Sequence, residues 1–422
     1  MAFYILAGLL CTFTEVIVAS SPPRQVRDQV LSINPQSDEE IQFVKQICSQ
    51  YQAVFWQPSS IDDIRLNKEI HLYVNASNIE EVKNQLATAT IIQRVLIEDV
   101  QQLIKKQKHT NEALRPRGLF SYYERYHPLE EIYLWMSEIT NAYPSFIQKI
   151  LIGPSSEKRL IYVLKLFNGT ASPKGAVWID CGIHAREWIA PAFCQWFVQY
   201  LIDSQDTMIT DILKSFEIYI LPIWNVDGYE YTWTTDRFWR KNLSKHHRGQ
   251  CRGTDLNRNW DASWCGPGAS NNPCSQTYCG RHPESEPEVK AVATFIRQRS
   301  DHIKGYISIH SYSQMVMFPY SYKTSKSKDH KELNYIAQKA VTAVRSVHGT
   351  NYRYGNSATS IYLSSGCSDD WAYDLGIKYS FTFELRDTGR YGFLLPPDLI
   401  KPTCEEATAA VSEILRHITQ TI

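Results

Sequence analysis

Apolar residues along this chain alternate between short strand-like runs and longer stretches with helical spacing. Runs rich in β-branched and apolar residues predict strands at 159–167, 175–183, 216–224, 303–309 and 378–385. Amphipathic stretches between them predict helices at 129–142, 188–202, 284–299, 331–346 and 404–418. Such alternation is typical of an α/β fold in which helices cover both faces of a mixed sheet.

The region before residue 95 repeats this mixture on a smaller scale. Its strand-like runs lie at 51–57 and 68–74, and its helical patterns at 37–50 and 77–89. We therefore expect a small α+β domain. A polar helical stretch at 97–109 follows it.

A basic segment, Arg115-Pro116-Arg117-Gly118, separates the two regions. Exposed segments with proline and glycine are frequent sites of proteolysis. We therefore predict activation by cleavage after Arg117, with a plain flexible linker as the alternative. The expected division is a signal peptide at 1–20, a pro-domain with its connecting segment at 21–117, and a catalytic domain at 118–422.

Residues 175–202 hold the first candidate chemistry. A buried strand pattern breaks at Gly182, and His184 and Glu187 follow before the helix begins. The carboxyl edge of a strand is where α/β sheets open their ligand crevice. The H-x-x-E spacing alone is weak evidence, because it occurs also at His109 and His127.

His310 supplies a candidate third ligand, again at the end of a strand-like run. Two imidazoles and one carboxylate suit a catalytic zinc ion that keeps its fourth position for water. The alternative is three polar residues that are satisfied by hydrogen bonds beneath loops.

Charge does not direct the chain toward a polyanion. Lys plus Arg number 44 and Asp plus Glu number 44, so there is no overall field to attract nucleic acid or anionic lipid. We interpret the local basic clusters at 105–109 and 245–248 as solvated surface.

The N-terminus resembles a secretory signal peptide. Residues 3–13 form an apolar run, and the small residues Ala19 and Ser20 follow. The run is too short to cross a bilayer, no Lys or Arg precedes it, and Glu15 follows closely. No later stretch predicts a membrane span. Sequons that fit a glycosylated secreted product occur at Asn75, Asn168 and Asn242.

Ten cysteines favour the same oxidising compartment. Four of them crowd into one loop-rich segment: Cys251, Cys265, Cys274 and Cys279. We interpret these as disulfides that staple loops. A zinc knuckle is the alternative, although the segment lacks a paired C-x-x-C.

Seven separated motifs resemble, in the same order, those of the A/B-type zinc metallocarboxypeptidases. They are HAREW (184–188), FWRKN (238–242), GTDLNRNW (253–260), HSYSQ (310–314), SIYLSSG (360–366), SDDW (368–371) and FTFELRDTGRYGF (381–393). The resemblance covers the whole chain and is greatest to the B branch. Softer matches at 73–77 and 320–330 point to the plasma form of that branch. The family resemblance implies an α/β fold with a mixed eight-stranded sheet flanked by helices, and a pro-domain that shields the cleft.

The resemblance also implies roles for the residues of the motifs. One zinc ion is held by His184, Glu187 and His310, and lowers the pKa of its water to about 7. Glu384 matches the general base, although by pattern alone it could instead form an ion pair with Arg386.

Further residues match the substrate-binding positions of the family. Arg240 matches the cation that stabilises the oxyanion, which is worth about 3 to 4 kcal/mol by analogy with single oxyanion donors. Asn257 and Arg258 match the pair that grips the terminal carboxylate of the substrate. The remaining matches are Tyr362 as a mobile cover, Arg186 as an auxiliary cation, Ser311 and Tyr312 as substrate contacts, and Asp255 as the residue that orients a ligating histidine.

Asp369 matches the position that carries Asp in B-type enzymes and an apolar residue in A-type enzymes. It would pair with the side chain of a C-terminal Arg or Lys, whereas Asp370 is expected to be structural. The disulfides implied by resemblance are Cys181–Cys194, Cys251–Cys274 and Cys265–Cys279. The pairing of Cys48, Cys367 and Cys404 stays open.

The sequence thus predicts a secreted, monomeric zymogen of a zinc exopeptidase. Its expected partners are peptide and protein C-termini that end in Lys or Arg, and a trypsin-like activating protease. The plasma resemblance implies that it limits fibrinolysis by trimming the C-terminal lysines of fibrin. The alternatives are a digestive carboxypeptidase B, an inactive protein that binds C-termini, and an N-terminal domain that inhibits other proteases.

Overall fold

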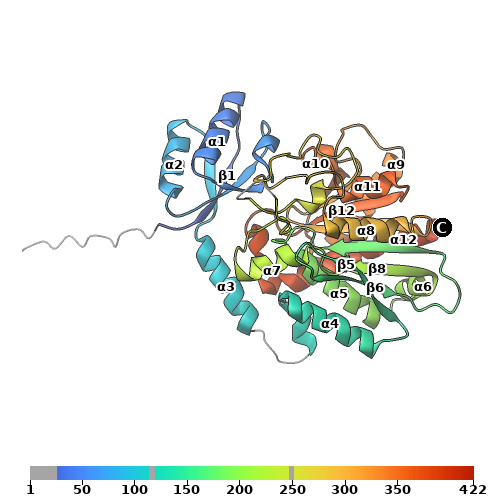
Figure 1. Ribbon diagram of the computed structural model, residues 1–422. Helices are drawn as coiled ribbons and strands as arrows, with labels where there is room; N and C mark the ends of the chain where they lie inside the picture. The colour runs from blue at the N-terminus through green and yellow to red at the C-terminus, as the bar shows by residue number, and fades with distance from the viewer. Residues whose placement is uncertain (1–25, 114–118, 247–250) are drawn as a thin grey trace, which may run out of the picture.

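The computed structural model describes residues 26–113, 119–246 and 251–422. The expected signal peptide at 1–20 and the expected cleavage site at Arg117 lie outside these residues. A small N-terminal domain, drawn in blue, lies beside a larger domain that contains the rest of the described chain (Figure 1).

The N-terminal domain is an antiparallel sheet with two helices on one face. Its strands, in the spatial order β2-β3-β1-β4, are β1 (Gln29–Ile33), β2 (Val54–Gln57), β3 (Ile70–Val74) and β4 (Gln93–Ile97). Its helices are α1 (Asp38–Gln50) and α2 (Ile79–Thr88), and α3 (Val100–Ala113) then leads toward the larger domain (Figure 1).

The two faces of the small sheet bury different residues. Side chains alternate along a strand, so Leu31 and Ile33 pack into the core beneath α1 and α2. Val30, the residue before Leu31, faces the other side and joins Trp56 in a second cluster that includes Tyr312 and other residues of the larger domain. The N-terminal domain is therefore held to the larger domain by the outer face of its sheet.

An eight-stranded mixed sheet forms the centre of the larger domain, in the order β11-β10-β12-β9-β7-β8-β6-β5. The strands are β5 (Ile147–Pro154), β6 (Leu160–Leu166), β7 (Gly175–Cys181), β8 (Phe216–Leu221), β9 (Ile303–Ser311), β10 (Met315–Phe318), β11 (Arg353–Asn356) and β12 (Tyr379–Leu385). The four central strands, β12, β9, β7 and β8, run parallel. β7 and β8 are buried at every position, as expected for strands covered on both faces.

Helices cover both faces of this sheet. They are α4 (Leu129–Ala142), α5 (Ile189–Asp203), α6 (Thr207–Ser215), α7 (Val226–Thr234), α8 (Pro287–Arg297), α9 (His330–His348), α10 (Ser357–Ser360), α11 (Ser368–Asp374) and α12 (Ile400–Thr421). Trp178 packs on Phe295 of α8. Gly305 lies between the neighbouring Val177 and Ile418 of α12, on the other face. The prediction of a mixed sheet flanked on both sides is confirmed.

The parallel strands bring three distant motifs to one edge. β9 lies between β12 and β7, and the register pairs Glu384 with His310 and Cys181 with Ile309. His184 follows β7 after Gly182 and Ile183. The carboxyl ends of parallel strands form the crevice in which α/β proteins bind ligands.

Three disulfides stabilise this part of the fold: Cys181–Cys194, Cys251–Cys274 and Cys265–Cys279. They are the three that the family resemblance implied, and they exclude a zinc knuckle in the 251–279 segment. Cys48, Cys367 and Cys404 are buried and unpaired. Within the described ranges, no helix combines the length and hydropathy needed to cross a membrane.

Candidate active site

His184, Glu187 and His310 converge at the carboxyl edge of the sheet. Their candidate ligand atoms lie within 4.8 Å of one another, and all three side chains are buried. Nδ1 of His184 lies 2.8 Å from Glu187 and 3.1 Å from Nδ1 of His310. Nδ1 of His310 lies 3.2 Å from the other oxygen of Glu187. Two imidazole nitrogens and a carboxylate that face one point form a donor set suited to zinc.

The outer nitrogens of both histidines fit this arrangement. Nε2 of His184 lies 3.2 Å from Asp255 Oδ1, and Nε2 of His310 lies 3.1 Å from the hydroxyl of Ser308. A proton on each Nε2 leaves the Nδ1 lone pair free to coordinate a metal. Burial and the charge of Arg240 hold the pKa of His184 below its usual value, which favours the neutral ligand form.

Asp255 connects the metal ligands to Arg240. Its Oδ2 accepts hydrogen bonds from Nε and Nη2 of Arg240, at 3.0 and 2.8 Å. Nη1 of Arg240 lies 3.9 Å from Glu187. This guanidinium is therefore fixed beside the convergence point of the three candidate ligands, and it lines the same cavity.

Glu384 lines this cavity and forms no ion pair with the residues that the structure describes. Its Oε2 is buried and has no hydrogen-bond partner among the described residues. Burial, with the nearby carboxylate of Glu187, raises the pKa of Glu384 to about 8. Arg386 pairs instead with Glu406, so the alternative reading of Glu384 as an ion-pair partner of Arg386 is wrong. A bound divalent cation would lower the pKa of Glu384 toward the range of a general base.

Asn257 and Arg258 line the next part of the cavity. Nε of Arg258 donates to the carbonyl of Gly268 at 2.8 Å, and Nη1 donates to the carbonyl of Asn257 at 2.7 Å. The side-chain oxygen of Asn257 accepts a hydrogen bond from the backbone of Ser368. These contacts orient both side chains, and Nη2 of Arg258 and the amide NH₂ of Asn257 make no hydrogen bond with the described part of the chain, so they remain for a ligand.

Asp369 lies farther along the cavity wall. Its Oδ2 is buried without a partner among the described residues, and burial raises its pKa. Asp370, next in the chain, accepts hydrogen bonds from the backbone N–H groups of Ser321 and Tyr322. The two adjacent carboxylates thus differ: Asp369 has an oxygen in the cavity wall without a partner among the described residues, whereas Asp370 holds a loop.

The N-terminal domain covers the cavity at several of the expected substrate contacts. The carbonyl of Phe55 accepts from Nη1 of Arg186 at 3.4 Å, and Ser59 contacts the hydroxyl of Tyr362 at 3.4 Å. His71 contacts the hydroxyl of Tyr312 at 2.7 Å. Sequence reasoning did not single out the pro-domain residues Phe55, Ser59 and His71, because no motif indicates which side chains face another domain. Ser311, another expected substrate contact, donates from its backbone N–H to Glu187 within the larger domain.

The three sequons differ in exposure. Asn75 and Asn168 are exposed. Asn242 is fully buried, and its amide donates to Glu286 and Glu288. The structure therefore contradicts the prediction of a glycan at Asn242, because the nitrogen that would carry the sugar is enclosed and hydrogen-bonded.

Family comparison agrees with this geometry. Residues 132–410 match the model described as zinc carboxypeptidase, and residues 31–107 match the carboxypeptidase activation peptide. The chain belongs to the zinc carboxypeptidase family. Carboxypeptidase B2 from Bos taurus is 51% identical over 400 residues, which are 94% of each chain. Carboxypeptidase A6 from Homo sapiens is 46% identical over 398 residues, 94% of this chain and 91% of the relative.

Among solved structures, the crystal structure of thrombin activatable fibrinolysis inhibitor matches with a TM-score of 0.90 and 51% identity. The match covers 94% of this chain and 100% of the other. As a member of the zinc carboxypeptidase family, this chain is a metallocarboxypeptidase of the B type with zinc as its cofactor, and its activation peptide marks it as a zymogen.

Proposed function

We propose that this chain is a secreted zymogen whose mature form removes C-terminal Arg or Lys from peptides and proteins, and that cleavage after Arg117 activates it. The observation that carries the proposal is the buried Oδ2 of Asp369, which has no hydrogen-bond partner among the described residues and lies in the cavity that holds the three candidate zinc ligands. A buried carboxylate oxygen without a partner is costly, and a guanidinium or ammonium from the substrate removes that cost.

The substrate's last residue is held at two points. Nη2 of Arg258 and the amide of Asn257 bind the terminal carboxylate, and Asp369 binds the basic side chain. A guanidinium suits a carboxylate because its two N–H groups match the two oxygens. Two fixed points on one residue place the last peptide bond at the metal-binding edge, which lowers the entropic part of the barrier.

Proton transfer and charge stabilisation come from two further residues. His184, Glu187 and His310 would hold the zinc ion, which would supply a water of lowered pKa and polarise the scissile carbonyl. Glu384 accepts a proton from the attacking water at its free Oε2 and delivers it to the leaving amine. Arg240, held by Asp255, stabilises the negative charge that develops on the carbonyl oxygen.

The N-terminal domain blocks this reaction until it is released. Trp56, Gln57 and Ser59 line the same cavity as the metal ligands. Access for a peptide C-terminus therefore requires that the β2 region move away. Similarity to thrombin activatable fibrinolysis inhibitor supports a plasma role in which removal of C-terminal lysines from fibrin limits fibrinolysis.

One assay tests the proposal. The purified chain is incubated with a trypsin-like protease, and release of C-terminal Arg and of C-terminal Phe is compared with and without a chelator. We expect Arg release only after cleavage, little Phe release, and loss of activity on chelation. N-terminal sequencing of the product should begin at Gly118. Equal release of Arg and Phe would refute the specificity, and full activity without cleavage would refute the zymogen.

A further inference from the structure

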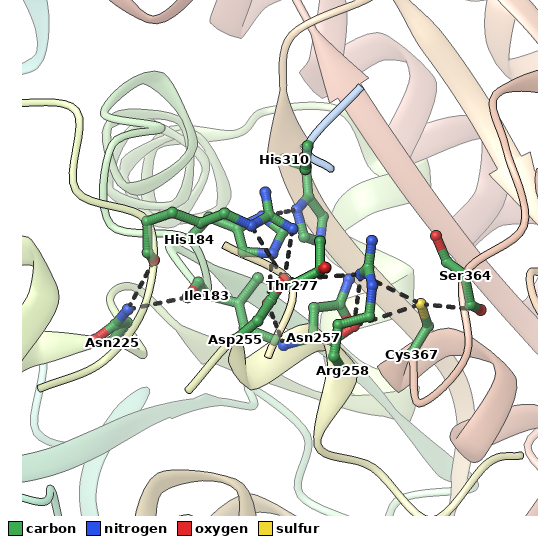
Figure 2. A network of polar contacts seen from close by, with 12 residues as sticks. Ile183, His184, Asn225, Asp255, Asn257, Arg258, Thr277, His310, Ser364 and Cys367 are labelled. Atoms are coloured by element: carbon green, nitrogen blue, oxygen red, sulfur yellow. Dashed lines mark hydrogen bonds and ion pairs between the residues drawn. The ribbon is translucent and has the colours of Figure 1, made fainter. Parts of the chain in front are cut away.

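Cys367 lies where the carboxylate-binding residues meet the specificity pocket. It is unpaired, 4% exposed, lines the cavity, and precedes Asp369 by two residues. Figure 2 shows its sulfur next to Arg258, with Ser364 on the other side. The mechanism above does not use this thiol.

The sulfur contacts both residues that bind the substrate carboxylate. Sγ lies 3.8 Å from Nη1 of Arg258 and 3.5 Å from the carbonyl of Asn257. It lies 3.5 Å from the carbonyl of Ser364 as well. Burial raises the pKa of the Cys367 thiol, so the group is a neutral S–H that donates to one of these carbonyls while its sulfur accepts from Arg258.

The backbone brings the two segments together around this contact. The N–H of Trp260 donates to the carbonyl of Gly366, and the N–H of Gly366 donates to the carbonyl of Ala262. Gly366 has φ +73°, and a Cβ there would lie 2.3 Å from the carbonyl oxygen of Arg258. The 364–368 segment therefore lies directly against the backbone that carries Arg258, and the thiol reaches across from it.

Two backbone carbonyls hold Nε and Nη1 of Arg258, as described above, and the sulfur limits movement on the side of Nη1. We propose that Cys367 is a positioning residue for substrate binding: its thiol keeps Arg258 and the backbone of Asn257 aligned to receive the terminal carboxylate. This inference rests on the carboxylate-binding roles proposed above for those two residues.

Substitutions of Cys367 distinguish a role in positioning Arg258 from a role in packing. In the mature enzyme, Cys367→Ala should raise KM for a C-terminal Arg peptide about 3- to 10-fold, as expected for one lost hydrogen-bonding contact, and leave kcat nearly unchanged. Cys367→Ser should restore most of the KM, because a hydroxyl can also donate and accept. The matched control is Cys404→Ala, which removes a second unpaired, fully buried thiol from the α12 core.

A thiol reagent provides a second measurement. Methyl methanethiosulfonate forms an S–S bond to Cys367 as the thiol proton goes to solvent and methanesulfinate leaves. We expect the reagent to raise the KM of the mature enzyme. It should not modify Cys367 in the uncleaved zymogen, whose cavity is covered, and it should not change the KM of Cys367→Ala. Modification of Cys367 in the mature enzyme without a change in KM overturns the proposal.

Arg258→Ala distinguishes failure of this inference from failure of the proposed function. If Arg258→Ala raises KM while Cys367→Ala and Cys404→Ala both leave KM unchanged, then only the role of Cys367 is refuted. If Arg258→Ala also leaves KM unchanged, the carboxylate-binding assignment itself is wrong.

Discussion

The imidazole of His71, in the N-terminal domain, lies parallel to the ring of Tyr312 in the larger domain. The interplanar angle is 8°, the centroids are 5.7 Å apart, and Nδ1 of His71 lies 2.7 Å from the Tyr312 hydroxyl. Both side chains are buried, at 2% and 5% exposure. This pair joins the pro-domain directly to an expected substrate contact.

His71→Ala should weaken closure of the cleft in the uncleaved chain. Loss of a buried hydrogen-bond partner costs about 1–2 kcal/mol, so the population of molecules with an open cleft should rise about 5- to 30-fold. The measurement is hydrolysis of a C-terminal Arg peptide by protein that has not been exposed to protease. Ile92→Ala, at a pro-domain side chain that is 72% exposed, is the control. Unchanged residual activity in His71→Ala would contradict this role.

Glu384→Gln should abolish turnover and leave the metal bound. The amide keeps the shape of the side chain but cannot accept the proton, so kcat should fall about 10²- to 10⁴-fold. Zinc content, measured by elemental analysis, should stay at one ion per chain. His310→Ala is the contrasting variant, because it removes a ligand and should lose both zinc and activity. Substantial activity in zinc-loaded Glu384→Gln would show that another group transfers the proton.

The central strands and long helices could be predicted because their apolar patterns are continuous. The predicted helix at 129–142 coincides with α4, and the strands β7, β9 and β12 lie where expected. Shorter elements were missed. β10 and β11 contain four residues each, and the exposed residues of β11 give no alternation to detect.

The active site could also be predicted only in part from the sequence. The resemblance identified the side chains of the large domain one motif at a time. Register then explains why His310 and Glu384 meet, since they are direct neighbours on parallel strands. The contacts of Phe55, Ser59 and His71 could not be predicted, because they depend on how one sheet face packs on another domain. The burial of Asn242 could not be predicted either, because a sequon does not indicate whether its asparagine is exposed in the folded protein.

Asp369→Leu should shift the preference of the mature enzyme from basic to apolar C-terminal residues. The substitution removes the only carboxylate proposed to pair with the substrate side chain and leaves an apolar wall. We expect the ratio of kcat/KM for Arg over Phe to fall at least about 100-fold, as for loss of a buried ion pair worth about 3 kcal/mol. Asp370→Asn, which disturbs the Ser321 loop, should lower Tm with a smaller change in this ratio. An unchanged preference for Arg would refute the pocket assignment.

The stability of the uncleaved chain should depend on pH through Asp63 of the pro-domain. Burial raises the pKa of Asp63 to about 6, opposed by the charges of Arg258 and Arg65. The unfolded value is about 3.9, so the folded state binds this proton more tightly. The resulting stabilisation is fully present below about pH 4 and is lost as pH rises through about 6.

Asp63→Asn should remove this pH dependence, since the amide never ionises. At pH 8 the variant should gain about 1–3 kcal/mol relative to the natural chain, the size expected when folding raises the pKa of a largely buried carboxyl from about 4 to about 6, whereas at pH 4 the two should differ little. Thermal unfolding of both proteins at the two pH values measures this difference. The neighbouring exposed Asp62, changed to Asn, controls for the altered net charge. A gap in Tm between Asp63→Asn and the natural chain that is equal at pH 4 and pH 8 would contradict this prediction, because it would show that Asp63 does not change its protonation between these pH values.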